Sequence, residues 1–364
     1  MTFNWQQSDW PDFRYDQGAV ELELRDFADQ AGQVAGLLKG LSKGDQMNAL
    51  VQLMVAEAVK TSEIEGEYLS RPDVMSSVRH RLNLADAPAA TTDRASAGAG
   101  ELMVAVRESW DANLDEDTLF AWHRTLLPGN QRVVVGAWRT HEEPMQVISG
   151  AVGKGKLHFE APPSVTVPTE MARFIAWFNA SRSTITAAPV RAALVHLYFE
   201  SIHPFEDGNG RIGRALAEKA LSQGLGRPAT LSLSRTIEAY RRDYYNALEQ
   251  AQRSNEVTPW LRYFVSTVLT AQRDAETVVM FVLNQARFFD RHQDRLNDRQ
   301  LRVMRRMLEA GPGGFEGGMN ARKYISLTRA SKATATRDLQ ALAQLGALQP
   351  VGAGRSARYD LNLG

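Results

Sequence analysis

The sequence contains no cysteine, and this absence excludes several kinds of chemistry. Disulfide bonds, thiolate nucleophiles and cysteine-based zinc or iron–sulfur sites cannot form. A reducing compartment is compatible with such a composition, so we expect a cytoplasmic protein.

Long hydrophobic runs are also lacking. No window approaches the roughly 18 uncharged apolar residues of a membrane span, so we expect no membrane partner. The first residues, MTFNWQQSDWPDF, are polar and aromatic rather than basic and then apolar, which predicts no secretory signal. The chain has 364 residues, 44% of them hydrophobic, enough for two or three packed units.

Net charge is absent from the chain as a whole, with 42 basic and 42 acidic residues, but the charges are unevenly distributed. Residues 291–364 hold 13 Lys and Arg against 6 Asp and Glu, a net charge of +7, which leaves −7 for the rest. Such asymmetry indicates a module that faces nucleic acid or an acidic partner, although solvated surface arginines give the same excess.

The densest motif is the run HPFEDGNGRIGR at residues 203–214, called the signature below. Gly208 and Gly210 allow the backbone to turn with positive φ and to present N–H groups to an anion, directly before a helix N-terminus. Arg211 and Arg214 lie three residues apart, on one face of the first helical turn, where two guanidinium groups can hold phosphate oxygens. This part of the run predicts a polyphosphate site.

Two other residues of the signature supply reactive chemistry. Asp207 offers a hard oxygen ligand for the Mg²⁺ that accompanies a triphosphate. His203 is the one group of the run with an ordinary pKa near neutrality, which makes it the natural general base for an attacking hydroxyl.

The signature resembles that of the Fic (filamentation-induced-by-cAMP) family, HxFx(D/E)GNGRxxR, at every fixed position. The resemblance implies that His203 deprotonates a Ser, Thr or Tyr hydroxyl of a target protein while Asp207 holds Mg²⁺ on the α- and β-phosphates of ATP. In-line attack at the α-phosphorus would transfer AMP and release pyrophosphate. The residues implied in ATP and phosphate binding are Glu206, Asp207, Gly208, Asn209, Gly210, Arg211 and Arg214.

A second motif, TSEIEG at residues 61–66, resembles the inhibitory pattern (S/T)xxxE(G/N) of Fic proteins in which an inhibitory segment precedes the catalytic core. It ends a helical pattern, with Gly66 where a helix C-cap is expected. The resemblance implies an inhibitory element of Thr61, Glu65 and Gly66, in which Glu65 pairs with Arg214 and removes the arginine that orients the γ-phosphate. The alternative is that Glu65 is a solvated charge near a helix end.

Hydrophobic periodicity predicts a mainly helical core. Helices are expected at residues 19–41, 45–62, 71–81, 93–113, 118–127, 169–179, 189–201, 212–224, 236–251 and 259–280. Short β-prone runs at 133–135, 147–148 and 157–159 predict a hairpin, which is either an ordinary surface hairpin or the flap of the Fic family, about residues 136–163, where a target segment pairs with the backbone. Of three tyrosines in the 236–251 helix, Tyr240 is the first choice for the adenine pocket, against a role in the core.

The C-terminal segment has a pattern of its own. Helices are expected at 298–310, 321–327 and 331–345, and residues 351–359 look like the wing of a winged helix-turn-helix. Lys332, Thr334, Thr336 and Arg337 would face phosphates or bases. Docking of a protein, or support of a dimer, is the alternative.

We therefore expect a mainly α protein: a Fic-type helical bundle with a β-hairpin flap, plus a C-terminal winged helix-turn-helix module. The expected domains are an N-terminal helical region (1–95) with an inhibitory helix ending near residue 66, a catalytic core (96–290) and the winged helix (296–364). The predicted function is a protein adenylyltransferase, autoinhibited by Glu65, that uses ATP and Mg²⁺ and modifies itself as well as a target docked on the flap.

Three alternatives stay open. In one, the same site works in reverse and Glu65 orients a water that removes AMP from a modified protein. In another, the site uses a different nucleotide. In the third, the chain is a regulator that binds DNA through residues 296–364. A homodimer is also left open.

Overall fold

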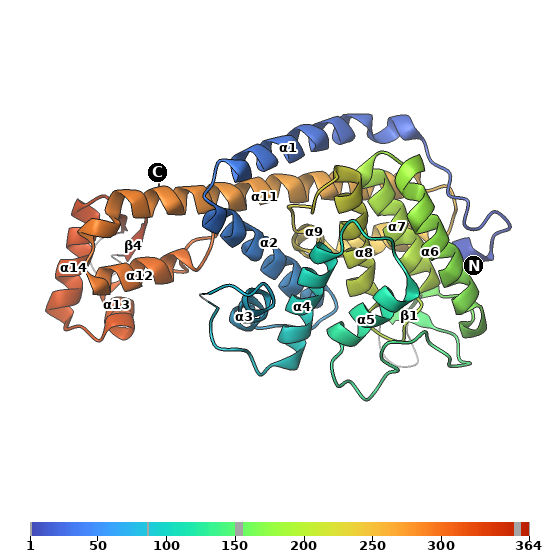
Figure 1. Cartoon of the computed structure of the whole chain (residues 1–364), viewed down its shortest axis with the longest axis horizontal. Coiled ribbons are helices and arrows are strands. Elements are labelled where there is room, and N and C mark those ends of the chain that lie inside the picture. The colour runs from blue at the N-terminus through green and yellow to red at the C-terminus, as the bar shows by residue number, and fades with distance from the viewer. Residues whose placement is uncertain (1, 86, 150–155, 353–357, 364) are drawn as a thin grey trace. The chain divides into compact units, whose positions relative to one another are not determined.

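A computed structural model describes residues 2–85, 87–149, 156–352 and 358–363, and these residues are mainly helical, as predicted (Figure 1). Within these ranges no helix is both long enough and apolar enough to span a membrane. The helices are α1 (Glu21–Lys39), α2 (Lys43–Ile64), α3 (Arg71–Arg81), α4 (Arg94–Glu108), α5 (Glu116–Leu126), α6 (Val167–Thr184), α7 (Ala188–Ile202), α8 (Asn209–Leu225), α9 (Leu233–Ala239), α10 (Arg241–Ala251), α11 (Thr258–His292), α12 (Asp298–Leu308), α13 (Ala321–Thr328) and α14 (Lys332–Gln344). The strands are β1 (Gln146–Ser149), β2 (Lys156–Glu160), β3 (Leu348–Val351) and β4 (Arg358–Leu361).

The chain forms two compact units. The first contains residues 1–34 and 50–275, and the second contains residues 35–49 and 276–364. The chain passes between them within α1, α2 and α11. The three domains expected at residues 1–95, 96–290 and 296–364 stay a prediction.

Helix α7 is the centre of the first unit. Every one of its residues is buried, as expected for a helix with few polar residues on any side. It packs against α8 and α6, while α4 packs against α3, α5 and α8 (Figure 1). The prediction of a buried helix over 189–201 is therefore confirmed, and the helix ends directly before His203.

The predicted hairpin is present, but one of its three expected runs is not a strand. β1 and β2 are antiparallel, with Val147 opposite Phe159 and Ile148 opposite Leu157; residues 150–155, part of the expected flap, lie outside the described residues. The run 133–135 has no strand structure. The Val134 N–H donates to Glu206 Oε2 at 3.0 Å instead, so this run supports the signature rather than a sheet.

The single helix predicted over 236–251 is divided into two. Tyr240 has φ −123° and ψ 38°, outside the helical region, and separates α9 from α10. The Ser232 side chain caps α9 by accepting from the Arg235 N–H. The prediction of one continuous helix is wrong here because periodicity continues across the break.

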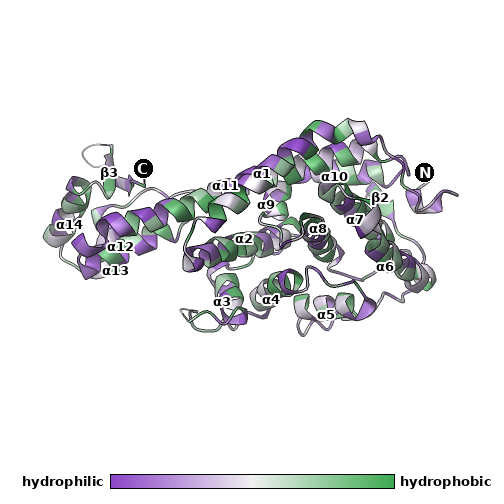
Figure 2. Ribbon diagram, turned by 45° about the horizontal axis from the view of Figure 1, so that its top comes forward, coloured by the Kyte–Doolittle hydropathy of each residue, from purple (hydrophilic) through white to green (hydrophobic). Residues whose placement is uncertain are grey.

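The second unit has its own core, described by itself. Three helices, α12, α13 and α14, are followed by the antiparallel pair β3 and β4. Figure 2 shows α12 in alternating green and purple, as expected for a helix with one apolar face. The core residues include Phe288, Val303, Met304, Met307, Met319, Tyr324, Leu339 and Leu342. Residues 353–357, the middle of the expected wing, lie outside the described residues, and the winged helix-turn-helix stays a prediction.

Candidate active site

The signature begins where α7 ends and continues into α8. His203 follows the helix in the left-handed region, with φ 51° and ψ 60°, which is uncommon for a residue with a side chain. Gly208, with φ 81°, is the N-cap of α8. The loop between these two residues is therefore held at both ends by buried helices.

The Asn209 side chain forms two hydrogen bonds within this loop. Its Nδ2 donates to the Phe205 carbonyl at 2.8 Å, and its Oδ1 accepts from the Phe205 N–H at 2.9 Å. The side chain is buried. The Asn209 side-chain amide is thus hydrogen-bonded within the loop, and the contact of Asn209 with a phosphate stays a prediction.

His123, on α5, supports the loop from the other side. Its ring stacks on Phe205 with centroids 4.0 Å apart. The Gly136 N–H donates to Nδ1 at 2.9 Å, so the proton lies on Nε2, which donates to the Asp207 carbonyl at 3.1 Å. Burial lowers the pKa of His123, which keeps the ring neutral and this tautomer in place.

Arg139 holds the beginning of the loop. Its Nε donates to the His203 carbonyl at 2.8 Å and its Nη2 to the Ile202 carbonyl at 3.3 Å. The same guanidinium donates to the Pro162 carbonyl at 2.5 Å and to Ser164 Oγ at 2.8 Å. Burial lowers the pKa of Arg139 to about 10, so the group is still charged at neutral pH. Arg139 thereby connects His203 to the segment that follows β2.

His203 is set up as a neutral base. Burial, together with the charge of Arg139, lowers the pKa of His203 to about 4. Its Nδ1 lies 3.7 Å from Glu200 Oε2. Burial raises the pKa of Glu200 to about 8, with the negative charge of Glu65 adding to the effect. At neutral pH the imidazole is therefore unprotonated and able to accept a proton.

Two glycines of the signature make room for carboxylates. A Cβ at Gly213 would lie 2.4 Å from Glu200 Oε1, and a Cβ at Gly210 would lie 2.2 Å from Glu65 Oε1. Both distances are too short for a real side chain. The Glu65 carboxylate therefore lies directly against the first turn of α8, where an anion is favoured.

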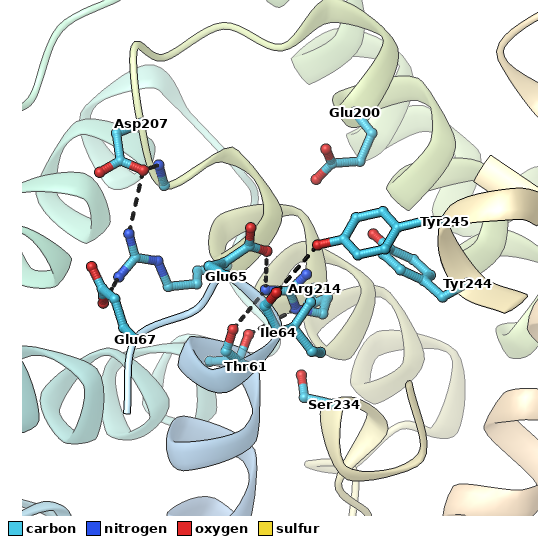
Figure 3. Close-up of polar contacts among 12 residues, drawn as sticks. Thr61, Ile64, Glu65, Glu67, Glu200, Asp207, Arg214, Ser234, Tyr244 and Tyr245 are labelled. Atoms are coloured by element: carbon cyan, nitrogen blue, oxygen red, sulfur yellow. Dashed lines mark hydrogen bonds and ion pairs between the residues drawn. The ribbon is translucent and has the colours of Figure 1, made fainter. Parts of the chain in front are cut away.

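The structure places Thr61 and Glu65 of the inhibitory motif in contact with Arg214 (Figure 3). Arg214 Nη2 lies 2.7 Å from Glu65 Oε1, and its Nε donates to Thr61 Oγ1 at 2.8 Å. Burial would lower the pKa of Arg214, but the ion pair with Glu65 raises it above its ordinary value. Gly66, with φ 85°, ends the helix.

A second acid of this segment holds the other arginine. Arg211 Nη1 lies 2.5 Å from Glu67 Oε2, and its Nη2 lies 3.5 Å from Asp207 Oδ1. The Arg211 side chain is 3% exposed and that of Glu67 is 43% exposed. Glu67 was not among the predicted residues, because the inhibitory pattern ends at Gly66. Both arginines of the signature are thus paired with residues at the C-terminal end of α2.

Asp207 fits a magnesium ion that is shared with a substrate. Its carboxylate is 46% exposed, and Oδ1 accepts from the Gly208 N–H at 2.6 Å. The described residues contain no group of three or more His, Asp or Glu side chains arranged to hold a metal. One carboxylate suffices for Mg²⁺ only where phosphates and water supply the other ligands.

For two further residues, Glu206 and Tyr240, the predicted contact with the nucleotide stays a prediction. Glu206 Oε2 accepts from the Val134 N–H. Tyr240 is 59% exposed at the junction of α9 and α10, and its place in an adenine pocket stays a prediction. Tyr245 lies closer to the inhibitory motif, since its hydroxyl donates to the Ile64 carbonyl at 3.3 Å.

Comparison with known proteins identifies the class. Residues 113–221 match the model of the Fic/DOC family, and residues 3–84 match a domain of unknown function, DUF4172. The chain therefore carries a Fic/DOC family domain, and the resemblance of its signature is confirmed.

Several similar proteins have named functions. Protein adenylyltransferase Fic of Culex quinquefasciatus is 35% identical over 94 residues, which are 26% of this chain and 17% of that protein. Protein adenylyltransferase fic-1 of Caenorhabditis briggsae is 30% identical over 148 residues, 40% of this chain and 26% of that protein. A probable protein adenylyltransferase of Aquifex aeolicus is 33% identical over 94 residues, 26% of this chain and 27% of that protein. The chain thus spans between 17% and 27% of the length of these relatives.

Solved structures share the fold. A Fic family protein from Desulfovibrio desulfuricans G20 has a TM-score of 0.55 at 19% identity and covers 96% of this chain and 98% of its own. A Fic domain containing signaling protein from Bacteroides thetaiotaomicron has a TM-score of 0.54 at 18% identity, over 71% of this chain and 97% of its own.

Proposed function

We propose that this chain is a protein adenylyltransferase that transfers AMP from ATP to a Ser, Thr or Tyr hydroxyl of a target protein. The observation that supports this most directly is one loop and one helix N-terminus that hold a neutral base, a half-exposed carboxylate and two buried arginines. His203, Asp207, Arg211 and Arg214 are these residues. The relatives named above, which are called protein adenylyltransferases, agree with this proposal.

The reaction follows from this arrangement. The target hydroxyl gives its proton to His203 as its oxygen attacks the α-phosphorus of ATP. The bond between the α-phosphorus and the oxygen that bridges to the β-phosphate breaks, and pyrophosphate leaves with its electron pair. His203 then releases the proton to water. The N–H groups at the start of α8 and the two arginines hold the phosphates.

Asp207 would hold the Mg²⁺, which when bound supplies positive charge to the α- and β-phosphates. Arg139 and His123 contribute by position alone. They hold the backbone carbonyls of His203 and Asp207, so that the base and the metal ligand keep a fixed separation.

The resting enzyme is inhibited by Glu65. Its carboxylate lies at the N-terminal turn of α8 and pairs with Arg214, so it competes with the γ-phosphate for the same positive charges. ATP that binds in this state is not oriented for attack.

The flap offers a docking site for the target. Val147, Ile148 and Leu157 are 38%, 55% and 38% exposed, and an extended target segment adds to a strand edge through its backbone. The hairpin is anchored to α10, because Glu249 pairs with Lys156 at 3.0 Å and with His158 at 2.6 Å.

The test is incorporation of label into the full chain itself from ATP labelled at the α- or at the γ-phosphorus. We expect only the α-label to be incorporated, and Glu65→Gly to raise incorporation above wild type. Adding His203→Ala should lower the rate by about 10² to 10⁴, and adding Arg214→Ala should remove the gain. Glu63→Gly is the matched control, since Glu63 pairs with Lys60 at 2.5 Å rather than with a signature arginine.

Two outcomes would contradict the proposal. If folded Glu65→Gly protein incorporates no label from ATP, GTP, UTP or CDP-choline, the transferase assignment fails. If wild type instead removes AMP from a modified protein and Glu65→Gly abolishes that removal, the site works in the reverse direction.

A further inference from the structure

We propose that the second unit binds duplex DNA through the outer face of α14, a function separate from nucleotide transfer. The first observation is charge. Residues 319–337, all described by the structure, contain no Asp or Glu. They contain five basic residues: Arg322, Lys323, Arg329, Lys332 and Arg337.

The second observation is a tight pair of helices. α13 and α14 are separated only by residues 329–331, and Arg329 makes the turn in the left-handed region with φ 57°. Side chains cap both helices, since Asn320 accepts from the Lys323 N–H at 3.0 Å and Ser331 from the Thr334 N–H at 3.2 Å. A short turn between two packed helices, with the strand pair β3 and β4 after them, is the arrangement that places a second helix in the major groove.

The third observation is the composition of the two faces of α14. The inner face contributes Ala335, Leu339 and Leu342 to the core. The outer face is exposed and consists of Lys332, Ala333, Thr336, Arg337, Gln340 and Gln344. Ala333 and Thr336 are small enough to let the helix approach a groove closely, and the others are hydrogen-bonding side chains.

The one acidic residue of α14 is turned inward. Asp338 is 6% exposed, accepts from the Tyr324 hydroxyl at 2.8 Å and pairs with Arg299 Nε at 3.0 Å. The only carboxylate of the helix is therefore neutralised inside the unit. A phosphate that approaches the outer face meets Lys332 and Arg337 without repulsion from an acid on the same helix.

These features favour DNA over a protein partner. Stable protein interfaces have a core of aromatic or aliphatic anchors, and the outer face of α14 has none. Arginine makes paired hydrogen bonds with guanine, and glutamine does so with adenine, at base edges in the major groove. Arg337 and Gln340 are placed to read bases, and Lys332 and Arg329 to contact phosphates.

The experiment uses the full chain and a pool of random 20-base-pair duplexes, with selection of bound sequences followed by fluorescence anisotropy on the selected duplex. We expect enrichment of a defined sequence and an affinity that falls steeply as salt rises. Arg337→Ala should weaken binding by about 5-fold or more and relax the sequence at one position. Lys332→Ala should weaken all sequences alike and reduce the salt slope by about 1. Arg25→Ala, an exposed arginine on α1, should leave binding unchanged.

Three results would overturn the proposal. The first is a pool with no enriched sequence and no salt-dependent binding, which would leave a protein as the partner of this face. The second is duplex binding that Lys332→Ala and Arg337→Ala both leave unchanged in folded protein. The third is equal binding of duplex RNA, because an A-form major groove does not admit a helix.

Discussion

Asn209 shows how one side chain of a phosphate loop can act through the backbone. Its amide group both donates to and accepts from Phe205 while buried beside α7. Loss of that amide leaves two backbone groups of Phe205, itself a buried residue, without partners. A buried polar group without a partner costs about 1 to 3 kcal/mol.

We therefore expect Asn209→Ala to lower the free energy of unfolding by about 1 to 3 kcal/mol or more. The same substitution should also reduce activity. Urea denaturation followed by tryptophan fluorescence measures the first effect. Asn246→Ala, at an exposed position of α10, is the control and should change the free energy of unfolding by less than about 0.5 kcal/mol. If Asn209→Ala weakened ATP binding and left stability unchanged, the side chain would act on the phosphate instead.

Some residues of the site can be predicted from the sequence and others cannot. His203, Asp207, Arg211 and Arg214 were identified because they lie within twelve consecutive positions. Arg139 and His123 were not, because they act on carbonyls 64 and 84 residues away, and only the fold creates such contacts. Glu200 did have a local signal: it is the one acid of a mainly apolar helix, three residues before His203.

At the scale of elements, the C-terminal end of α2 acts on the signature as a pair of acids. Glu65 holds Arg214, and Glu67, beyond the C-cap glycine, holds Arg211. The two contacts differ in exposure, since the Glu67 side chain is 43% exposed and that of Glu65 is 31% exposed. Solvent screening makes the pair with Glu67 the weaker of the two.

We expect Glu67→Gln to raise AMP transfer by about 2- to 5-fold in the Glu65→Gly background, because Arg211 is then free for the phosphates. In wild type, Glu67→Gln should raise AMP transfer by a smaller factor, since Glu65 still pairs with Arg214. The measurement is AMP incorporation at several ATP concentrations, with Glu63→Gln, a nearby acid in the last turn of α2, as the control. A lower rate in the folded double variant would mean that Glu67 positions Arg211 for ATP rather than withholding it.

The sequence predicts a helix or strand correctly where its hydrophobic periodicity matches the burial of residues in the folded chain. The prediction is wrong where tertiary contacts determine the backbone conformation instead. α7 was predicted because an apolar run of its length has no other stable place than a core. The break at Tyr240 was missed because the apolar spacing runs across it. The run 133–135 has strand propensity, but its backbone is used to hold Glu206.

At the scale of the whole molecule, several buried titrating groups make stability depend on pH. Glu200 has a pKa of about 8 in the folded chain against 4.5 ordinarily, through burial. Its stabilising contribution is fully present below pH 4.5 and is lost as the pH rises through 8. Burial lowers the pKa of His196 to about 3 and, with Arg139, that of His203 to about 4, from 6.5. Their contribution has the opposite sign, since it increases with pH up to 6.5.

The two effects oppose each other below pH 6.5. Above pH 6.5 the contribution of the histidines no longer changes with pH, so the buried carboxyl groups determine how stability changes. We therefore expect the melting temperature of the first unit to fall between pH 6.5 and pH 8, because the unfolded chain releases the Glu200 proton and the folded chain retains it. Glu200→Gln should reduce this fall. Glu218, whose pKa burial also raises to about 8, leaves a residual dependence of the melting temperature on pH in that variant.

Thermal unfolding monitored by tryptophan fluorescence at both pH values measures the change. Glu101→Gln, at an exposed position of α4, is the control and should behave as wild type. A melting temperature that rises over this range, or an unchanged slope in Glu200→Gln, would show that Glu200 is ionised in the folded chain and lies beside His203 as a charge.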